Sequence, residues 1–444
     1  MVMHKIRAAS YLRRTISEPY SSRRLSTVMN QIPESKLYPN GGMHESLIND
    51  SSKMIPEADG PIYTAYTDWL GVKDLMASKL NVLLIFCPLG LIAASRWGAL
   101  YTFWFNFIAL IPLAAILGQS TEELALHTGD LIGGLLNATF GNAVEMILTI
   151  QSLREGLLTV VQGTLLGSIL SNLLLVLGMS FLAGGLFHHI QTFNRQGASC
   201  STSMLMLACL AFILPTTLRD AHPEDTGTVL EVSRFTAVLV GFTYFLYLFF
   251  QLYTHLNLFK QEQREDAASL MAESVDGVAV EDVVGDDWPT MSWPTCVLLL
   301  LTSTVLVALQ SEALVSSIEG VCASGRLSKS FIGIILLPIV GNAAEHATAV
   351  TVAIKNKPDL VMGVAVGSST QIAMFMVPFA VIAGWVMDVP MTLAFDNIAV
   401  VVLVISILIT IGVVQDGESN WLEGAMLMVA YAIIAGVYWF NADE

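Results

Sequence analysis

Two short stretches of the chain, Gly141-Asn142-Ala143-Val144-Glu145 and Gly341-Asn342-Ala343-Ala344-Glu345, are nearly identical and stand 200 positions apart. Each lies inside a long apolar run. Glu145 and Glu345 are the only carboxylates that we find deep within such a run. A charged side chain at the centre of a bilayer costs roughly 2.5–3.5 kcal/mol on insertion scales. Its presence at two matched positions therefore predicts a site for a cation.

The composition is that of a membrane protein. Only 13% of the 444 residues are charged, against about 25% in soluble domains, and the mean hydropathy is +0.64. The apolar residues fall in blocks of the length that crosses a bilayer as a helix. A net charge of −16 gives no indication of nucleic-acid binding. We predict eleven spans in the lipid bilayer, near 80–97, 99–118, 131–153, 159–184, 201–218, 235–254, 295–311, 330–354, 360–386, 393–414 and 420–440.

The chain divides into four parts by composition. Residues 1–78 are polar and basic, and we predict a cytosolic, mostly disordered tail. The tail has no apolar segment that would serve as a cleavable signal peptide, so the first span must insert the chain. Residues 79–254 hold the first helix and a first transmembrane repeat, and residues 295–441 hold a second repeat. Residues 255–294 between them form an acidic loop, which the positive-inside rule allows in the cytosol beside the basic tail.

Other residues repeat at the same offset of 200. Gly133 matches Gly333, Gly163 matches Gly363, and Gly167-Ser168 matches Gly367-Ser368. The third span therefore corresponds to the eighth, with five crossings between them. Because five is odd, the two copies cross the membrane in opposite directions, as in many secondary transporters. We predict an all-α polytopic membrane protein of eleven transmembrane helices, in which one helix precedes two inverted five-helix repeats.

The repeated motif has the donors of a hard-cation site. In each copy the asparagine and the glutamate are three residues apart, so a helix places both side chains on one face. Antiparallel repeats then bring together two carboxylates, two amide oxygens and the carbonyls of a broken helix, which glycine favours. These oxygens suit Ca²⁺, with Mn²⁺ as second choice, better than Zn²⁺ or Cu⁺. The alternative is that each glutamate only joins helices by pairing with its asparagine. The predicted metal-binding residues are Glu145, Glu345, Asn142, Asn342, Gly141 and Gly341.

Two facing carboxylates also provide a mechanism for antiport. Burial and mutual repulsion raise their affinity for protons, and they titrate as a coupled pair. One divalent cation neutralises the pair, and so do two protons. If the empty dianion cannot change its access side, cation movement in one direction requires proton movement in the other.

Further polar residues flank the motif. His346 follows the second glutamate where Met146 follows the first. A neutral imidazole there could gate the path, select the ion or sense pH, and a satisfied core histidine or a direct ligand are the alternatives. Glu122 precedes the third span and could attract cations to an entrance, unless it is only a solvated helix end. The predicted lining residues on the partner spans are Ser168, Ser171, Ser368 and Gln371, which could equally hold helices together.

The basic tail carries a candidate regulatory residue. Two arginines stand ahead of Ser26, an arrangement that resembles basophilic kinase sites. A phosphate on Ser26 would add about −1.5 to −2 charges to a basic segment. We predict regulation by a kinase, with a purely topogenic tail as the alternative.

With these residues in view, the chain resembles the calcium/proton exchangers, the CAX branch of the calcium/cation antiporter superfamily. The resemblance covers roughly residues 75–441. It rests on the stretch from His127-Thr128-Gly129-Asp130 through Glu145, on Gly341-Asn342-Ala343-Ala344-Glu345-His346, and on Gly367-Ser368-Ser369-Thr370-Gln371. It implies eleven spans, a site built on both motif glutamates, functional roles for Glu122 and His346, and residence in a vacuolar membrane.

The resemblance implies a secondary active antiporter that exchanges Ca²⁺ for H⁺ by alternating access at the bilayer midplane. A sodium-coupled calcium exchanger is the neighbouring alternative and would favour more site hydroxyls. An intramembrane enzyme would need a buried nucleophile and base or a metal triad, and the sequence has no His-Glu-x-x-His motif. A channel is disfavoured by the acidic pair in an inverted repeat. We expect no catalytic residue and no cofactor beyond the transported ions.

Overall fold

The computed structural model describes residues 61–255, 289–325 and 327–440. Of these described residues, 61–74 and 290–292 belong to one compact unit and the others to a second. In the smaller unit, Asp68 of helix α5 (Pro61–Met76) accepts hydrogen bonds from the backbone and the hydroxyl of Ser292. This helix lies within the predicted tail, and it forms because Pro61 suits a first helical position and residues 62–70 contain neither Pro nor Gly.

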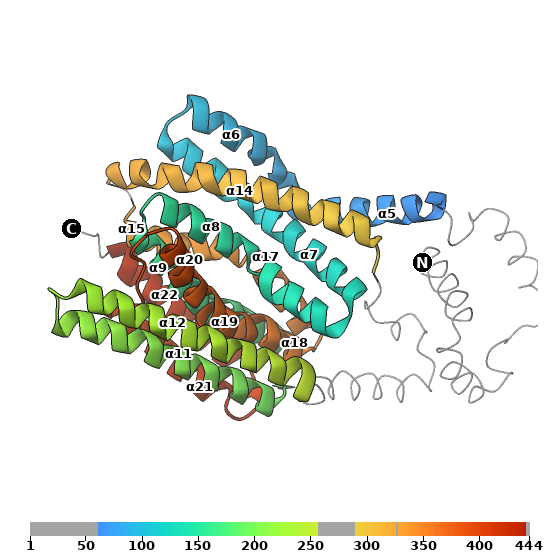
Figure 1. Ribbon diagram of the computed structural model, residues 1–444. Coiled ribbons are helices and arrows are strands. Elements are labelled where there is room, and N and C mark those ends of the chain that lie inside the picture. Colours follow the sequence, from blue (N-terminus) through green and yellow to red (C-terminus); the bar gives the residue numbers. More distant parts are fainter. Residues whose placement is uncertain (1–60, 256–288, 326, 441–444) are drawn as a thin grey trace, which may run out of the picture. The chain divides into compact units, whose positions relative to one another are not determined.

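The larger unit consists almost entirely of helices (Figure 1). Its one described sheet joins β1 (Gln191–Thr192) antiparallel to β2 (Glu418–Ser419). Five segments contain wider π-type turns and one is a 3₁₀ helix. The helical segments are η1 Lys79–Ile85, α6 Phe86–Arg96, α7 Ala99–Phe140, α8 Ala143–Arg154, α9 Leu158–Leu170, η2 Ser171–Val176, α10 Leu177–Phe187, α11 Arg195–Ala221, α12 Thr226–Phe249, η3 Phe250–Thr254, α14 Trp293–Ala323, α15 Lys329–Phe331, η6 Ile332–Leu336, α16 Leu337–Gly341, α17 Ala343–Ile354, α18 Pro358–Met362, η7 Gly363–Gly367, α19 Ser368–Gln371, η8 Ile372–Met376, α20 Val377–Val386, α21 Asn397–Val414 and α22 Trp421–Phe440.

The membrane spans follow the predicted pattern closely. Nine of the described helices are long and apolar enough to cross a bilayer, and the bent pair over 329–354 makes a tenth. The predicted span 159–184 corresponds to Leu158–Phe187, for example. The predicted span 131–153 falls on the end of α7 and on α8, which are separated at residues 141–142. The count of eleven spans therefore stays a prediction.

Helix α7 folds back on itself, which reconciles its 42 residues with two predicted spans. A Cβ atom added to Gly133 would lie 2.8 Å from the backbone oxygen of Ala125. In a straight helix, residues eight apart are separated by about 12 Å along the axis. The chain therefore reverses between these two residues, close to the predicted gap between spans 99–118 and 131–153.

The centre of the larger unit is built from α9–η2–α10 and from the matching run α18–η7–α19–η8–α20. Leu165, Ile169 and Leu173 from the first run and Met374 and Val377 from the second are fully buried. The π-type turns η2 and η8 begin at nearly matched positions of the two repeats. Such turns interrupt the regular bonding of a helix and occur often at functional sites.

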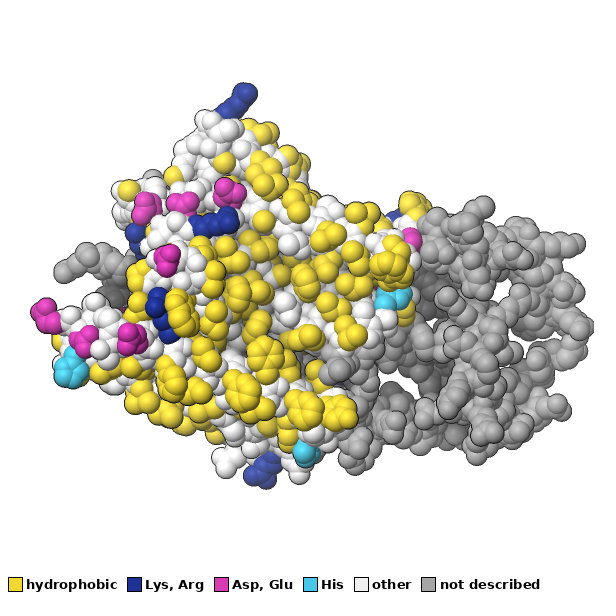
Figure 2. Space-filling model, viewed as in Figure 1, with side chains coloured by type: hydrophobic (Ala, Val, Ile, Leu, Met, Phe, Trp, Pro, Cys, Tyr) yellow, Lys and Arg dark blue, Asp and Glu magenta, His cyan; other side chains and the backbone are white. Residues whose placement is uncertain are grey.

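The outer helices carry large apolar side chains on their surface (Figure 2). Phe235, Phe242 and Phe249 of α12 are each more than half exposed, as are Leu298 and Leu301 of α14. In Figure 2, charged side chains gather toward the ends of the helices and leave an apolar area between them. This distribution is expected of a surface that contacts lipid.

The first helix is fixed to both repeats by two buried amides. Asn106 of α7 donates to the carbonyl of Gly90 at 3.3 Å, and Gln310 of α14 donates to the carbonyl of Cys87 at 3.0 Å. Both amides are fully buried, and both carbonyls belong to α6. The helix that precedes the repeats is thus joined to the first helix of each repeat.

The two repeats run in opposite directions. Gln162, near the start of the 30-residue span α9–α10, donates to the carbonyls of Thr392 and Ala394. Gln191, just beyond the other end of that span, donates to the carbonyl of Ala353 at the end of α17. About 38 Å of helix, from Gln162 to Phe187, separates these two contacts. Because α8 ends beside the start of α9, the matched helices α8 and α17 end on opposite sides of the bundle.

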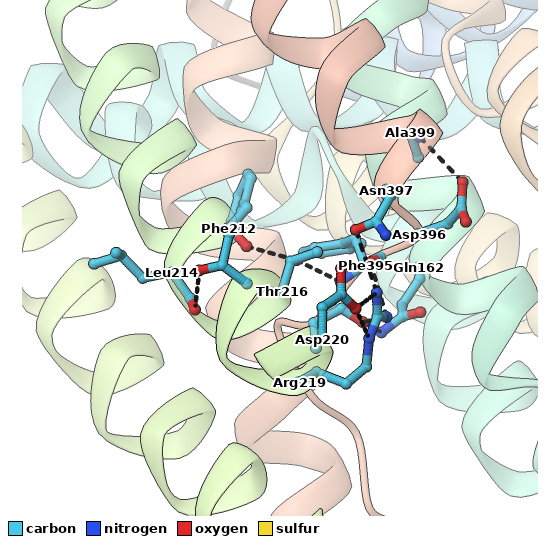
Figure 3. Close-up of polar contacts among 12 residues, drawn as sticks. Gln162, Phe212, Leu214, Thr216, Arg219, Asp220, Phe395, Asp396, Asn397 and Ala399 are labelled. Atoms are coloured by element: carbon cyan, nitrogen blue, oxygen red, sulfur yellow. Dashed lines mark hydrogen bonds and ion pairs between the residues drawn. The ribbon is translucent and has the colours of Figure 1, made fainter. Parts of the chain in front are cut away.

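The segment between α20 and α21 is held by the first repeat (Figure 3). Arg219 of α11 donates to the carbonyl of Phe395 at 2.9 Å, and Thr216 accepts from the backbone nitrogen of Phe395 at 3.1 Å. The predicted span 393–414 therefore starts four residues before helix α21, because Leu393 and Ala394 belong to this irregular segment. Helix α21 begins only at Asn397, because Asp396 caps it by accepting from the nitrogen of Ala399.

Because the repeats pack closely, we predict that alanine substitutions at the matched glycines Gly167 and Gly367 have different effects on stability. A Cβ on Gly167 would overlap the backbone of Ile334, whereas a Cβ on Gly367 would have its nearest neighbour at 3.9 Å. We expect Gly167→Ala to lower the free energy of unfolding by about 1–3 kcal/mol. Gly367→Ala should leave it unchanged or raise it slightly, since alanine favours helix. Thermal melting of the two purified variants in detergent measures the difference, and equal melting temperatures would contradict this packing.

Candidate functional site

Both copies of the repeated motif break a helix within the bundle. Asn142 and Asn342 have φ, ψ of −105°, 22° and −89°, 19°, outside the helical range, and each is the residue before a new helix. In the second repeat the two halves meet at 56°. The predicted break points lie immediately before these asparagines: Gly141 is the C-cap of α7, and Gly341 is the last residue of α16. Such irregular backbone at membrane depth is tolerated only where it is buried in protein or lines a cavity.

Each motif glutamate lies in the first turn of a half-helix. Glu145 and Glu345 are the third residues of α8 and α17. The N-terminus of a helix carries partial positive charge, which favours a carboxylate there. The Glu145 side chain is only 2% exposed, whereas Glu345 is partly exposed.

The two motifs meet across the repeat boundary. A Cβ on Gly341 would lie 2.5 Å from Oε1 of Glu145, so the absence of a side chain at Gly341 makes room for the carboxylate of the other repeat. The Glu345 carboxylate lies within electrostatic range of the carboxylates of Glu145 and Glu122. One oxygen of each motif glutamate, Oε2, is buried without a hydrogen-bond partner. Two unpartnered carboxylate oxygens from opposite repeats therefore converge.

The motif asparagines bind the partner spans of the opposite repeat. Asn142 donates to Oε1 of Gln371 at 3.0 Å. Asn342 donates to the backbone oxygen of Ser168 at 3.3 Å. Two of the residues predicted to line the site are thus in direct contact with the motifs. Because each amide nitrogen is engaged, the amide oxygens are left for other partners.

The serines predicted for the site differ in their placement. Ser168 and Ser171 are fully buried, and neither hydroxyl has a hydrogen-bond partner. Ser368 is partly buried at the start of α19, one turn before Gln371, and makes no described hydrogen bond to either motif. Sequence reasoning missed Tyr431 of α22, whose buried hydroxyl lies beside Ser171. No repeat or spacing singles out this tyrosine in the sequence.

Only one of the two ring nitrogens of His346 has a hydrogen-bond partner. Its Nδ1 is hydrogen-bonded to the carbonyl of Asn342, the residue at the helix break. A carbonyl accepts, so Nδ1 carries the proton and Nε2 is an acceptor in the neutral ring. This Nε2 is buried and has no hydrogen-bond partner. The side chain thus presents a free basic nitrogen next to Glu345.

Within the described ranges, no group of three or more His, Cys, Asp and Glu side chains is arranged to hold a metal ion. A cation between the motifs would therefore depend on two carboxylates supplemented by amide, hydroxyl and backbone oxygens. Such a donor set suits a hard cation such as Ca²⁺. The candidate regulatory residue, Ser26, lies outside the described residues.

The family model described as sodium/calcium exchanger protein matches residues 98–253 and 295–440, which are the two repeats. The chain belongs to this family of exchangers. It is a family of transporters and not of catalysts, as expected from the sequence. The predicted membership and helical fold are confirmed, while the individual site residues stay predictions.

Curated relatives align with most of this chain. It is 42% identical to vacuolar cation/proton exchanger 3 of Oryza sativa subsp. japonica over 381 residues, which are 83% of this chain and 87% of the relative. It is 42% identical to the Ca(2+)/H(+) antiporter of Aphanothece halophytica over 363 residues, 81% and 95% of the two chains. Among solved structures, native YfkE shares 34% identity with a TM-score of 0.67 and covers 81% of this chain and 99% of its own.

Proposed function

We propose that the exchanger moves Ca²⁺ in one direction and H⁺ in the other by alternating access at the paired motifs. The observation that carries the proposal is the convergence of Glu145 and Glu345 at two broken helices of opposite repeats. Relatives about 40% identical over four-fifths of the chain are named as cation/proton exchangers or Ca(2+)/H(+) antiporters, which supports the choice of ions. Mn²⁺ is a second candidate, because it also binds carboxylate and carbonyl oxygens.

The coupling of Ca²⁺ movement to H⁺ movement follows from the charge of the two carboxylates. Two carboxylates in an apolar interior form a dianion that is costly to hold without a partner. One Ca²⁺ or two protons neutralise it, so the site changes its access side only when loaded. The free Nε2 of His346 is a further proton acceptor beside the second carboxylate. Glu122, exposed and in electrostatic range of Glu345, attracts cations to the entrance on that side.

The carboxylate pair can be tested by removing one charge at a time. We expect Glu145→Gln and Glu345→Gln each to lower proton-driven ⁴⁵Ca²⁺ uptake into proteoliposomes at least a hundredfold. Glutamine keeps the shape of the side chain but neither neutralises Ca²⁺ nor carries the exchanged proton. Glu319→Gln, at an exposed end of α14, is the control and should transport normally.

Three results would contradict the proposal. Uptake near the wild-type rate by either variant would exclude a two-carboxylate site. Uptake by the wild-type protein that follows a Na⁺ gradient and ignores a pH gradient would favour sodium-coupled exchange. Uptake that persists without either gradient, at the rate of a pore, would indicate a channel.

The contact between Gly341 and Glu145 gives a second test of the site. In Gly341→Ala the new methyl group would displace Oε1 of Glu145, which is the end of a flexible side chain. We therefore expect a weaker apparent affinity for Ca²⁺, by about tenfold or more, with an unchanged melting temperature. Gly363→Ala is the control, because a Cβ there meets nothing within 4 Å. Unchanged affinity in Gly341→Ala would place Glu145 outside the ion site.

We further propose that the exchanger resides in a vacuolar membrane and that its tail regulates it. Several relatives are named as vacuolar exchangers or as a vacuolar calcium ion transporter, which supports the first part. The second part rests on the arginines before Ser26.

Deletion of residues 2–60 should raise the rate of transport per molecule, and Ser26→Asp should do the same if phosphorylation releases the tail. Equal rates for the wild type and both variants would leave only a topogenic role.

A further inference from the structure

The hydroxyl groups of the spans fall into two classes. Most serines and threonines bond to a carbonyl one turn earlier in their own helix, as Thr121, Thr216 and Thr370 do at 2.7–2.9 Å. Such a hydroxyl is satisfied without any ligand. Within the described ranges, four Ser and Thr hydroxyls are buried and have no partner. They belong to Thr149, Ser168, Ser171 and Ser311.

Two of these four, Ser168 and Ser171, were expected at the ion site from the repeat. Thr149 has the same property but was not expected. It lies four residues after Glu145 in α8, so both side chains lie on one face of the helix. Ser152, three residues further on, continues this face, and all three residues are only 2% exposed.

This polar stripe belongs to one repeat alone. The residues at the matched positions of α17 are Ala349 and Val352, which cannot donate or accept a hydrogen bond through their side chains. The architecture of the repeat therefore does not require a hydroxyl at Thr149. A polar group that is buried at membrane depth without structural need marks a path for ions or protons.

The polar stripe of Glu145, Thr149 and Ser152 runs along α8 toward one end of the bundle. It begins at the buried carboxylate of Glu145 and follows α8 toward Arg154. That end of α8 is opposite the end at which α17 stops, as the contacts of Gln162 and Gln191 require. Glu345 is partly exposed, whereas Glu145 and the stripe are closed to solvent in this structure.

We propose that Thr149 and Ser152 line the route by which Glu145 reaches the compartment at the Arg154 end of the bundle. The hydroxyls donate to and accept from the water and ions that enter when the helices facing α8, which include α9, α14 and α20, move apart. Closure in the present state leaves the Thr149 hydroxyl without its partner. The inference rests on the proposed exchange, but its first test does not depend on which ion is carried.

Side-specific labelling tests the route. Thr149→Cys is made in a protein whose five cysteines are replaced by alanine, and oriented vesicles are treated with a cationic, membrane-impermeant methanethiosulfonate. Glu155→Cys and Lys355→Cys, exposed at matched helix ends, report the two sides. We expect Thr149→Cys to react only from the Glu155 side and at least tenfold faster than Ala349→Cys does from that side. Reaction only from the Lys355 side, or none while Glu155→Cys reacts, would overturn the proposal.

A pair of substitutions then tests the hydroxyl itself. Thr149→Val keeps the shape of the side chain and removes the oxygen, whereas Thr149→Ser keeps the oxygen. We expect Thr149→Val to slow exchange at least tenfold with an unchanged melting temperature, and Thr149→Ser to stay within threefold of the wild type. Wild-type exchange by Thr149→Val would overturn the role of the hydroxyl. Labelling of Thr149→Cys from the Glu155 side in a protein that fails to exchange Ca²⁺ for H⁺ would reject the proposed function and support the route.

Discussion

The burial of two carboxylates between inverted repeats is the constraint on which the rest of the structure depends. A helix N-terminus stabilises a nearby anion by about 0.3–1 kcal/mol, and by about 2 in favourable cases. This is less than the several kcal/mol that an uncompensated buried charge costs. The helix N-terminus at each glutamate offsets part of that cost, and the missing side chain of Gly341 leaves room for Glu145. In the proposed function, a bound cation or protons offset the remaining cost.

Each repeat holds an irregular segment of the other repeat in place. The irregular segment before α21, in the second repeat, is held by Gln162 and Arg219 of the first. At the other side of the bundle, the segment after α10 is held by Asn356 and Asp359 of the second repeat. Each clamp satisfies backbone groups that a helix would otherwise satisfy, as a low-dielectric environment requires. The two halves are therefore bound at both ends while their motifs meet between them.

The sequence predicted the features that follow from periodicity and repetition. Both motifs interrupt a helix as predicted, and most predicted spans correspond to a helix long and apolar enough to cross a bilayer. Contacts between residues distant in sequence were not predictable in this way. The approach of Tyr431 to Ser171 leaves no pattern in the chain, and the cap at Asp396 delays a helix that hydropathy would begin at residue 393. The state of the Thr149 hydroxyl likewise depends on three-dimensional packing, because most threonines in these helices bond to their own backbone.

The two repeats are alike at the candidate ion site and differ in the residues next to it. An alternating site must present the same ligands to both compartments, and the residues that meet at the centre are accordingly repeated: glycine, asparagine and glutamate in each half. The two approaches lead to different compartments and face different concentrations of ions and protons. Selection can therefore act on them independently. His346 stands opposite Met146 in the alignment of the halves, and Thr149 stands opposite Ala349. The halves thus coincide at the proposed ion site and differ within about one helical turn of it, which is where an exchanger can distinguish one side of the membrane from the other.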